Sequence, residues 1–217
     1  MTYDIMKKNT VRDRFISHPH PEIWADTPEK NWNNWIWQQQ KRICSMEQLK
    51  KVINVTQEER DAFAKSHEEF KMGITPYYAS LIDKDDPNCP IRLQAVPKMG
   101  ELNVLSTDLE DPLAEERDMP VSGITHRYPD RVLFYTTHNC PVYCRHCTRK
   151  RKVADPGSAA QTKQLEDGLA YIESHKEIRD VVISGGDPLS TSDNRLEYIL
   201  SRLRAMSTSR SSGSERG

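Results

Sequence analysis

Three of the chain's five cysteines fall within eight residues, and this loop constrains the fold more than any other stretch. Cys140, Cys144 and Cys147 follow a C-x3-C-x2-C spacing, directly after the apolar residues 132–135. Thiolates are soft ligands, and three of them this close together can bind one face of an iron–sulfur cluster. Because a cubane cluster has more iron corners than these thiolates can occupy, one iron is left open to bind a small molecule. The spacing therefore predicts a 4Fe-4S site with a reactive iron.

Two simpler interpretations of the cysteines compete with a cluster. A structural zinc site usually needs a fourth ligand, and its cysteines usually come as spaced C-x2-C pairs. His146 lies between two of the cysteines and is poorly placed to be that ligand. Disulfides need an even number of thiols and an oxidising compartment, and nothing in the sequence suggests secretion. Cys44 and Cys89, which lie apart in the sequence, are predicted to be idle or buried thiols.

Three motifs together resemble one family. They are residues 125–131 (THRYPDR), residues 143–151 (YCRHCTRKR) and residues 184–188 (SGGDP). A C-x3-C-x2-C loop after an apolar strand is similar to that of the radical S-adenosylmethionine (SAM) enzymes, and the longer motifs narrow the likeness to the lysine 2,3-aminomutase family. The resemblance runs from about Trp32 to Met206.

The bulk composition argues against two classes of partner. A net charge of −1 and a pI near 6.7 give no electrostatic reason to expect nucleic acid or a membrane surface. The apolar runs are far shorter than the roughly 20 residues that a membrane span needs, and the first residues lack the apolar region of a signal peptide. We therefore expect a cytoplasmic protein, in which thiols stay reduced and available to metal.

The pattern along the chain divides it into five parts. Residues 1–27, with His18 and His20 beside prolines, are expected to form an irregular arm, and residues 28–83 a helical region. In that region Trp32, Trp35, Ile36 and Ile43 predict one apolar helix face, and 45–48, 56–59 and 75–76 are helix-start signals. Residues 84–121, rich in Pro, Asp and Glu, are expected to be a connector with few packed residues and a solvated acidic face.

After the connector the periodicity changes. Residues 131–137 and 180–184 are apolar strands of the buried type, and the patterns at 165–172 and 196–203 are helical. The order strand, loop, helix, strand, helix predicts an α/β fold with a parallel sheet over residues 122–206. The resemblance implies that these are the first βα units of a partial, incomplete radical SAM barrel. Residues 207–217 have a composition that predicts a disordered or frame-shifted tail, and we expect the chain to be a truncated member of the family.

The candidate ligand-binding residues lie beside the cysteine loop and after the second strand. Glycines at such a position let a backbone approach a ligand closely, and a carboxylate can receive an ammonium group. The resemblance implies that Gly185, Gly186 and Asp187 contact the amino group of SAM. It also implies that His146 contacts the adenosyl part of SAM.

The arginines are the other candidates, because a guanidinium binds a carboxylate or phosphate bidentately. By resemblance, Arg149 would bind the α-carboxylate of the substrate, and Arg127 would help to hold pyridoxal 5′-phosphate (PLP). Arg131 is a further candidate for cofactor binding, and a structural ion pair with an acid such as Asp130 is the alternative. Residues 149–152 are otherwise an ordinary basic run.

The implied reaction is an amino-acid 2,3-aminomutase reaction, an isomerisation that uses a 4Fe-4S cluster, SAM and PLP. The resemblance also implies a one-electron donor of the flavodoxin or ferredoxin type and a homo-oligomeric full-length protein. Lysine is the leading substrate and glutamate the alternative. The sequence offers no Gly-rich loop with a lysine that would bind PLP. A non-catalytic iron–sulfur or zinc protein, or a fragment that binds a cluster without mutase activity, therefore remains open.

Overall fold

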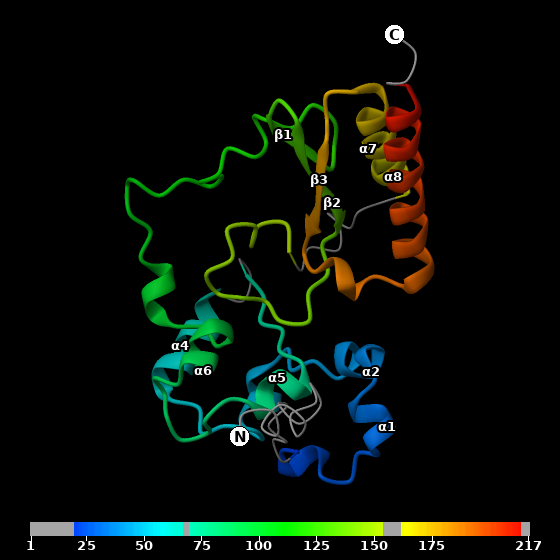
Figure 1. Ribbon diagram of the computed structural model, residues 1–217. Coiled ribbons are helices and arrows are strands. Elements are labelled where there is room, and N and C mark those ends of the chain that lie inside the picture. Colours follow the sequence, from blue (N-terminus) through cyan, green and yellow to red (C-terminus); the bar gives the residue numbers. More distant parts are fainter. Residues whose placement is uncertain (1–19, 67–69, 154–161, 214–217) are drawn as a thin grey trace, which may run out of the picture.

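The computed structural model describes residues 20–66, 70–153 and 162–213 and consists of a helical region and a sheet region (Figure 1). The cysteine loop lies where the two regions meet. The elements are η2 (Glu22–Trp24), α1 (Glu29–Trp32), α2 (Trp35–Gln40), α3 (Met46–Leu49), α4 (Gln57–Ser66), α5 (Pro76–Ser80), α6 (Pro90–Ala95), η3 (Met99–Leu102), β1 (Ile124–Tyr128), β2 (Arg131–Thr137), α7 (Thr162–Ser174), β3 (Asp180–Gly185), η5 (Pro188–Ser190) and α8 (Asp193–Gly213).

The first helices differ from the prediction of one continuous apolar face. The Asn34 side chain accepts hydrogen bonds from two backbone N–H groups and caps the start of α2. The predicted helix is therefore divided into two short helices, α1 and α2. Trp32 is buried as predicted, whereas Trp35 and Ile36 are exposed. Ile43 is buried too, but it lies beyond the end of α2 and forms a bridge with Ile74 instead of continuing a helix face. His20 stacks on Trp32 with ring centroids 3.8 Å apart, and His18 lies outside the described residues.

Two of the predicted helix starts are confirmed by reciprocal hydrogen bonds. Ser45 and Gln48 form the capping box of α3. The Thr56 hydroxyl accepts from the Glu59 N–H, and the Glu59 carboxylate accepts from the Thr56 N–H at 2.8 Å. Helix α5 begins at a proline as predicted, although the hydroxyl of the preceding threonine makes no capping bond.

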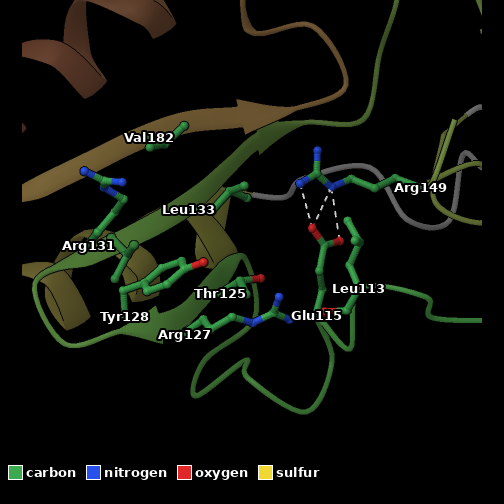
Figure 2. Close-up of a pocket in the computed structure, with 10 residues that line it drawn as sticks. Leu113, Glu115, Thr125, Arg127, Tyr128, Arg131, Leu133, Arg149 and Val182 are labelled. Atoms are coloured by element: carbon green, nitrogen blue, oxygen red, sulfur yellow. Dashed lines mark hydrogen bonds and ion pairs between the residues drawn. The ribbon is translucent and has the colours of Figure 1, made fainter.

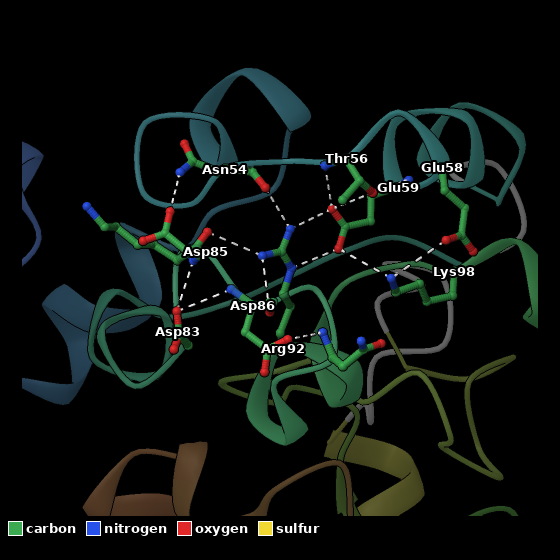
Figure 3. A network of polar contacts seen from close by, with 11 residues as sticks. Asn54, Thr56, Glu58, Glu59, Asp83, Asp85, Asp86, Arg92 and Lys98 are labelled. Carbon is green, nitrogen blue, oxygen red and sulfur yellow. Dashed lines mark hydrogen bonds and ion pairs between the residues drawn. The ribbon is translucent and has the colours of Figure 1, made fainter.

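Part of the stretch predicted as a connector belongs to the helical core. Helix α6 and the η3 turn lie within residues 84–121, and Ala95 and Val96 are fully buried against the core. Arg92 of α6 is also fully buried, where it forms an ion pair with Glu59 of α4 (Figure 3). The apolar and charged contacts together fasten this stretch to the helices before it.

The three strands form a sheet in the order β1-β2-β3. Strands β2 and β3 are parallel, which confirms the predicted parallel pairing and both predicted strands. Strand β1 pairs with β2 in the antiparallel direction and was not predicted, because its sequence mixes polar and apolar residues. The described part of the chain is therefore a mixed α/β structure with a small sheet.

The sheet has one face toward the helices and one toward a pocket. Ile124 and Phe134 pack against α7 and α8, which lie together on one side of the sheet (Figure 1). Gly168 of α7 permits this packing, because a Cβ there would lie 2.5 Å from the Phe134 ring. Leu133 and Tyr135 point the other way, as the period of two in a strand requires.

Helix α8 continues to Gly213 and so includes residues where the sequence predicted the start of a tail. Residues 214–217 lie outside the described part of the chain. Among the described residues, no helix combines the length and the apolar character that crossing a membrane demands.

Candidate active site

The cysteine loop and the Gly-Gly-Asp segment meet at one edge of the sheet. Because β2 and β3 are parallel, their carboxyl ends lie side by side, and each segment follows one of these ends. The Gly186 N–H donates to the Thr137 carbonyl at 2.6 Å, and the Asp187 N–H donates to the Asn139 carbonyl at 2.8 Å. The two motifs are thus joined by backbone hydrogen bonds.

Both glycines are required by this close approach. Gly185 has φ +130°, and a Cβ on it would lie 2.1 Å from the Thr137 carbonyl oxygen. A Cβ on Gly186 would lie 2.3 Å from the Asn139 carbonyl oxygen and 2.9 Å from the Cys140 Sγ. The second glycine therefore leaves a space against the first cysteine that a side chain would fill.

The three cysteines of the loop are free and half-buried. Burial, followed by the neighbouring thiols and Asp187, raises the pKa of Cys140 to about 11, and burial also raises the pKa of Cys144. Without a metal the thiols of Cys140 and Cys144 are therefore protonated near neutral pH, and metal binding would release their protons. Among the described residues, no three His, Cys, Asp or Glu side chains are arranged around a single ion.

The surroundings of these cysteines fit a cluster. Each thiolate binds a different iron of a cluster, so the sulfur atoms need not converge on one point. The loop offers three free thiols, an apolar floor in which Cys140 and Cys147 pack against Phe70, Tyr143 and Val153, and the space beside Gly186. Cys89 is buried in the helical core and Cys44 is exposed.

A pocket of about 230 Å³ lies on the open face of the sheet, and three of the predicted arginines line it (Figure 2). Arg149 forms a bidentate ion pair with the buried Glu115, with Nη2 2.6 Å from Oε1 and Nε 3.1 Å from Oε2. Its Nε also donates to the Tyr135 hydroxyl at 3.1 Å, and its Nη1 lies 3.5 Å from the Ser184 Oγ. Burial and the hydrogen bond to Glu115 raise the pKa of Tyr135 to about 12, although Thr125 and the charge of Arg149 act in the opposite direction.

The other two arginines of the pocket are paired with aspartates. Arg127 donates to Asp118 at 2.7 Å and to the Leu113 carbonyl. Arg131 forms an ion pair with Asp180 at 2.6 Å, which is the structural alternative considered for it, although with a different acid. The Arg127 side chain is 39% exposed and that of Arg131 is 52% exposed. An anion in the pocket can therefore still reach both guanidinium groups.

The remaining candidates lie close to the loop. His146 is exposed beside the cysteines. The Asp187 carboxylate accepts hydrogen bonds from the Leu189 N–H at 3.0 Å and the Ser190 hydroxyl at 3.4 Å, so it caps the turn η5 while lying near Cys140. Asp187 therefore has a structural role in the turn, in addition to the contact with the amino group of SAM that the resemblance implies.

Sequence reasoning missed the acid partners of the basic run. Acidic residues of the connector pair with three residues of this run: Glu115 with Arg149, and Glu116 with both Arg151 and Lys152. Their opposite charge was the available signal, but the acidic run was interpreted as a solvated face. Arg42, which contacts the cysteine loop from the helical region, carried no motif that marked it.

Comparison with known proteins agrees with this geometry. The model of the family "4Fe-4S single cluster domain" matches residues 127–212, which include all three loop cysteines. The chain is 50% identical over 185 residues to L-lysine 2,3-aminomutase of Bacillus subtilis, which covers 85% of this chain and 39% of that protein. In this shared region the chain belongs to the lysine 2,3-aminomutase family.

Two further relatives give the range of the family. L-lysine 2,3-aminomutase of Clostridium subterminale is 48% identical over 183 residues, covering 84% of this chain and 44% of that protein. Glutamate 2,3-aminomutase of Clostridioides difficile is 40% identical over 176 residues, covering 81% of this chain and 42% of that protein. The chain spans less than half the length of each of these relatives. The match to an iron–sulfur domain supports a cluster, rather than zinc, as the group that the loop cysteines hold.

Proposed function

We propose that this chain takes part in a radical SAM 2,3-aminomutase reaction, which moves the α-amino group of an amino acid to its β-carbon. The observation that carries the proposal is the meeting of the cysteine loop and the Gly-Gly-Asp segment at one sheet edge, beside an arginine-lined pocket. The relatives that the chain matches are aminomutases. We also propose that the sheet is the beginning of a partial radical SAM barrel.

In this proposal each motif holds one group. Cys140, Cys144 and Cys147 would bind a 4Fe-4S cluster, and Gly185 to Asp187 would hold the amino group of SAM beside it. His146 would contact the adenosyl part of SAM. When bound, the cluster and SAM supply the radical that takes a hydrogen atom from the substrate, and PLP supplies the carrier of the migrating amino group.

Arg149 would orient the substrate through its α-carboxylate. Its guanidinium already holds one carboxylate, that of Glu115, and keeps N–H groups on its other edge. Arg127, with Arg131 beside it, would face the phosphate of PLP at the other end of the pocket. Leu113, Leu133 and Val182 line the pocket between these charges and would exclude water from a bound ligand.

Lysine is the first substrate to test. Two lysine-specific relatives are 50% and 48% identical to the chain, whereas the glutamate-specific relative is 40% identical. Glutamate is the second.

The test is anaerobic reconstitution of the chain with iron and sulfide, followed by reduction in the presence of SAM. We expect about four irons per chain and formation of 5′-deoxyadenosine, and we expect β-lysine when PLP and L-lysine are added. Alanine at Cys140, Cys144 or Cys147 should abolish iron binding. The matched controls are Cys44→Ala and Cys89→Ala, which should keep it. Equal loss in all five variants, or bound zinc without cleavage of SAM, would overturn the proposal.

A further inference from the structure

The cysteine loop is held from outside the part of the chain that matches the iron–sulfur family. That match begins at residue 127, and besides the Gly-Gly-Asp segment within it, residues of the helical region before it also hold the loop. The Tyr143 N–H donates to the Gly73 carbonyl at 2.9 Å, and Val142 is buried in the helical core. A Cβ on Gly73 would lie 2.8 Å from the Tyr143 ring, so the loop and the helical region are in tight contact.

Arg42 holds the end of the loop that carries the first cysteine. Its Nη1 donates to the Cys140 carbonyl oxygen at 2.8 Å and to the Tyr143 hydroxyl at 2.9 Å. The guanidinium also lies over the Tyr143 ring, 5.0 Å from its centroid. Within the described part of the chain, the Nε of Arg42 is buried and has no acceptor, so this guanidinium keeps a donor that its neighbours do not use.

Arg145 and Glu101 hold the middle of the loop. Arg145 donates to both carboxylate oxygens of Glu101, at 2.9 and 3.0 Å, and its side chain is only 7% exposed. Its Nη1 donates to the carbonyls of residues 70 and 71, and its backbone N–H donates to the Gln94 carbonyl at 2.8 Å. The bond network spans the helical region from residue 70 to residue 101.

We propose that Arg42, supplied by the helical region, is a positioning residue of the iron–sulfur site that also favours the reduced cluster, with the Arg145–Glu101 pair as a second support of the loop. The inference rests on the proposed cluster. A cluster with three thiolates becomes more negative on reduction, and a cation beside the Cys140 backbone stabilises the more negative state. Residues that support metal ligands typically change metal affinity by about 10- to 100-fold when they are removed.

The experiment measures two properties of the reconstituted chain: the rate of iron release to a chelator and the midpoint potential of the cluster, followed by electron paramagnetic resonance. Arg42→Ala should release iron roughly 10-fold faster and should have a more negative potential than the unmodified chain. Arg42→Lys keeps the charge but not the paired hydrogen bonds. We therefore expect it to restore most of the potential and only part of the iron retention.

Two further variants separate charge from loosening of the loop. Glu101→Gln loosens the loop but removes a negative charge, so iron should leave faster while the potential does not become more negative. Arg179→Ala removes an exposed arginine that pairs with Asp130 at the start of β3, the end opposite the cysteine loop, and it should change neither property.

The outcomes distinguish this inference from the proposed function. If the unmodified chain binds no iron, the proposed cluster is wrong and this inference with it. If the unmodified chain binds about four irons and Arg42→Ala keeps its potential and its rate of iron release, only the role of Arg42 is overturned. The same applies if Arg42→Ala and Arg42→Lys shift the potential equally, because the charge would then have no part in it.

Discussion

An arginine–glutamate pair lies in the helical region and another beside the sheet, and the two pairs differ in how many of the arginine's N–H groups have an acceptor. In the helical region, Arg92 donates from Nε and Nη2 to the two carboxylate oxygens of Glu59 at 2.8 and 2.7 Å. Its other N–H groups donate to the backbone carbonyls of Asn54, Lys84 and Asp86 (Figure 3). All five N–H groups of this guanidinium have an acceptor, and both side chains are fully buried.

In the sheet region, Arg149 pairs with Glu115 but keeps capacity for a ligand. Nε and Nη2 donate to the Glu115 carboxylate (Figure 2). In the described part of the chain, Nη1 has only the long contact of 3.5 Å to the Ser184 Oγ. Within the described residues, one N–H on Nη1 and one on Nη2 have no acceptor, and the side chain is 20% exposed at a pocket. The comparison indicates that an arginine with every donor used supports the fold, whereas one with an open edge can also bind an anion.

Removal of Arg92 should have the largest effect on stability. Arg92→Ala leaves the Glu59 carboxylate fully buried with only the more distant Lys98, 3.7 Å from its Oε1, as a cation among the described residues. We therefore expect a loss of about 3–5 kcal/mol in the free energy of unfolding, measured with urea. The double variant Glu59→Met with Arg92→Met should be more stable than Arg92→Ala, because it buries no unpaired charge. Arg179→Ala, at an exposed ion pair, should cost about 0–1 kcal/mol. Equal losses for Arg92→Ala and Arg179→Ala would remove the basis of the comparison.

Replacement of Arg149 should affect binding more than it affects the fold. Arg149→Lys loses the planar fork, and a hydrogen bond to a charged group contributes about 1.5–3 kcal/mol. Binding of L-lysine to the reconstituted chain, measured by calorimetry, should therefore weaken by about 10- to 100-fold. The matched control is Arg151→Lys, in the same basic run and paired with Glu116 but outside the pocket, which should bind L-lysine normally. Equal weakening in the two variants would argue for general charge attraction instead of a carboxylate site.

The motifs could be predicted from the sequence because their signals are local. The spacing of the three cysteines, the apolar run of β2 and the capping box at Ser45 each depend on residues within a few positions of one another. The parallel pairing followed from the alternation of strands and helices. The position of the candidate site then followed, because both motifs come directly after the carboxyl ends of these two parallel strands.

The partners of these motifs could not be predicted, because they come from distant parts of the sequence. Glu115 lies 34 positions before Arg149, and Arg42 lies 98 positions before Cys140. Neither contact leaves a periodic pattern. The break between α1 and α2 was missed for the opposite reason, since one local cap at Asn34 outweighed the apolar spacing around it. Strand β1 was missed because its half-exposed residues lack the apolar run that marked β2 and β3.

The space beside Gly186 provides a smaller test of how tightly the sheet region is built. Gly186→Ala puts a Cβ into the Asn139 carbonyl and the Cys140 sulfur, and overpacking of this kind costs about 1–3 kcal/mol. We expect reduced iron content and a lower urea midpoint. Gly100→Ala is the matched control, since a Cβ at that position meets nothing within 4 Å. Full iron content in Gly186→Ala would show that the glycine is not needed for the cluster.

The smallest expected effect is on the pH dependence of stability in the pocket. Burial by itself would raise the pKa of Glu115, but hydrogen bonds from Arg149 and Tyr135, with the charge of Arg149, hold it below its usual value of 4.5. Because the pKa is lower in the folded state, the pair stabilises the fold above about pH 4.5, and this stabilisation is lost as the pH falls through the folded-state pKa.

Glu115→Gln should therefore lower the urea midpoint at pH 6, and its difference from the unmodified chain should shrink as the pH is lowered toward 3. Tyr135→Phe removes only one of the hydrogen bonds to Glu115 and should show the same trend with a smaller amplitude. A difference that stays constant across this pH range would mean that Glu115 contributes by packing alone. In that case the orientation of the Arg149 guanidinium would not depend on an ionised Glu115. The contrast between Arg149 and Arg92 would then be only a difference in how deeply the two side chains are buried.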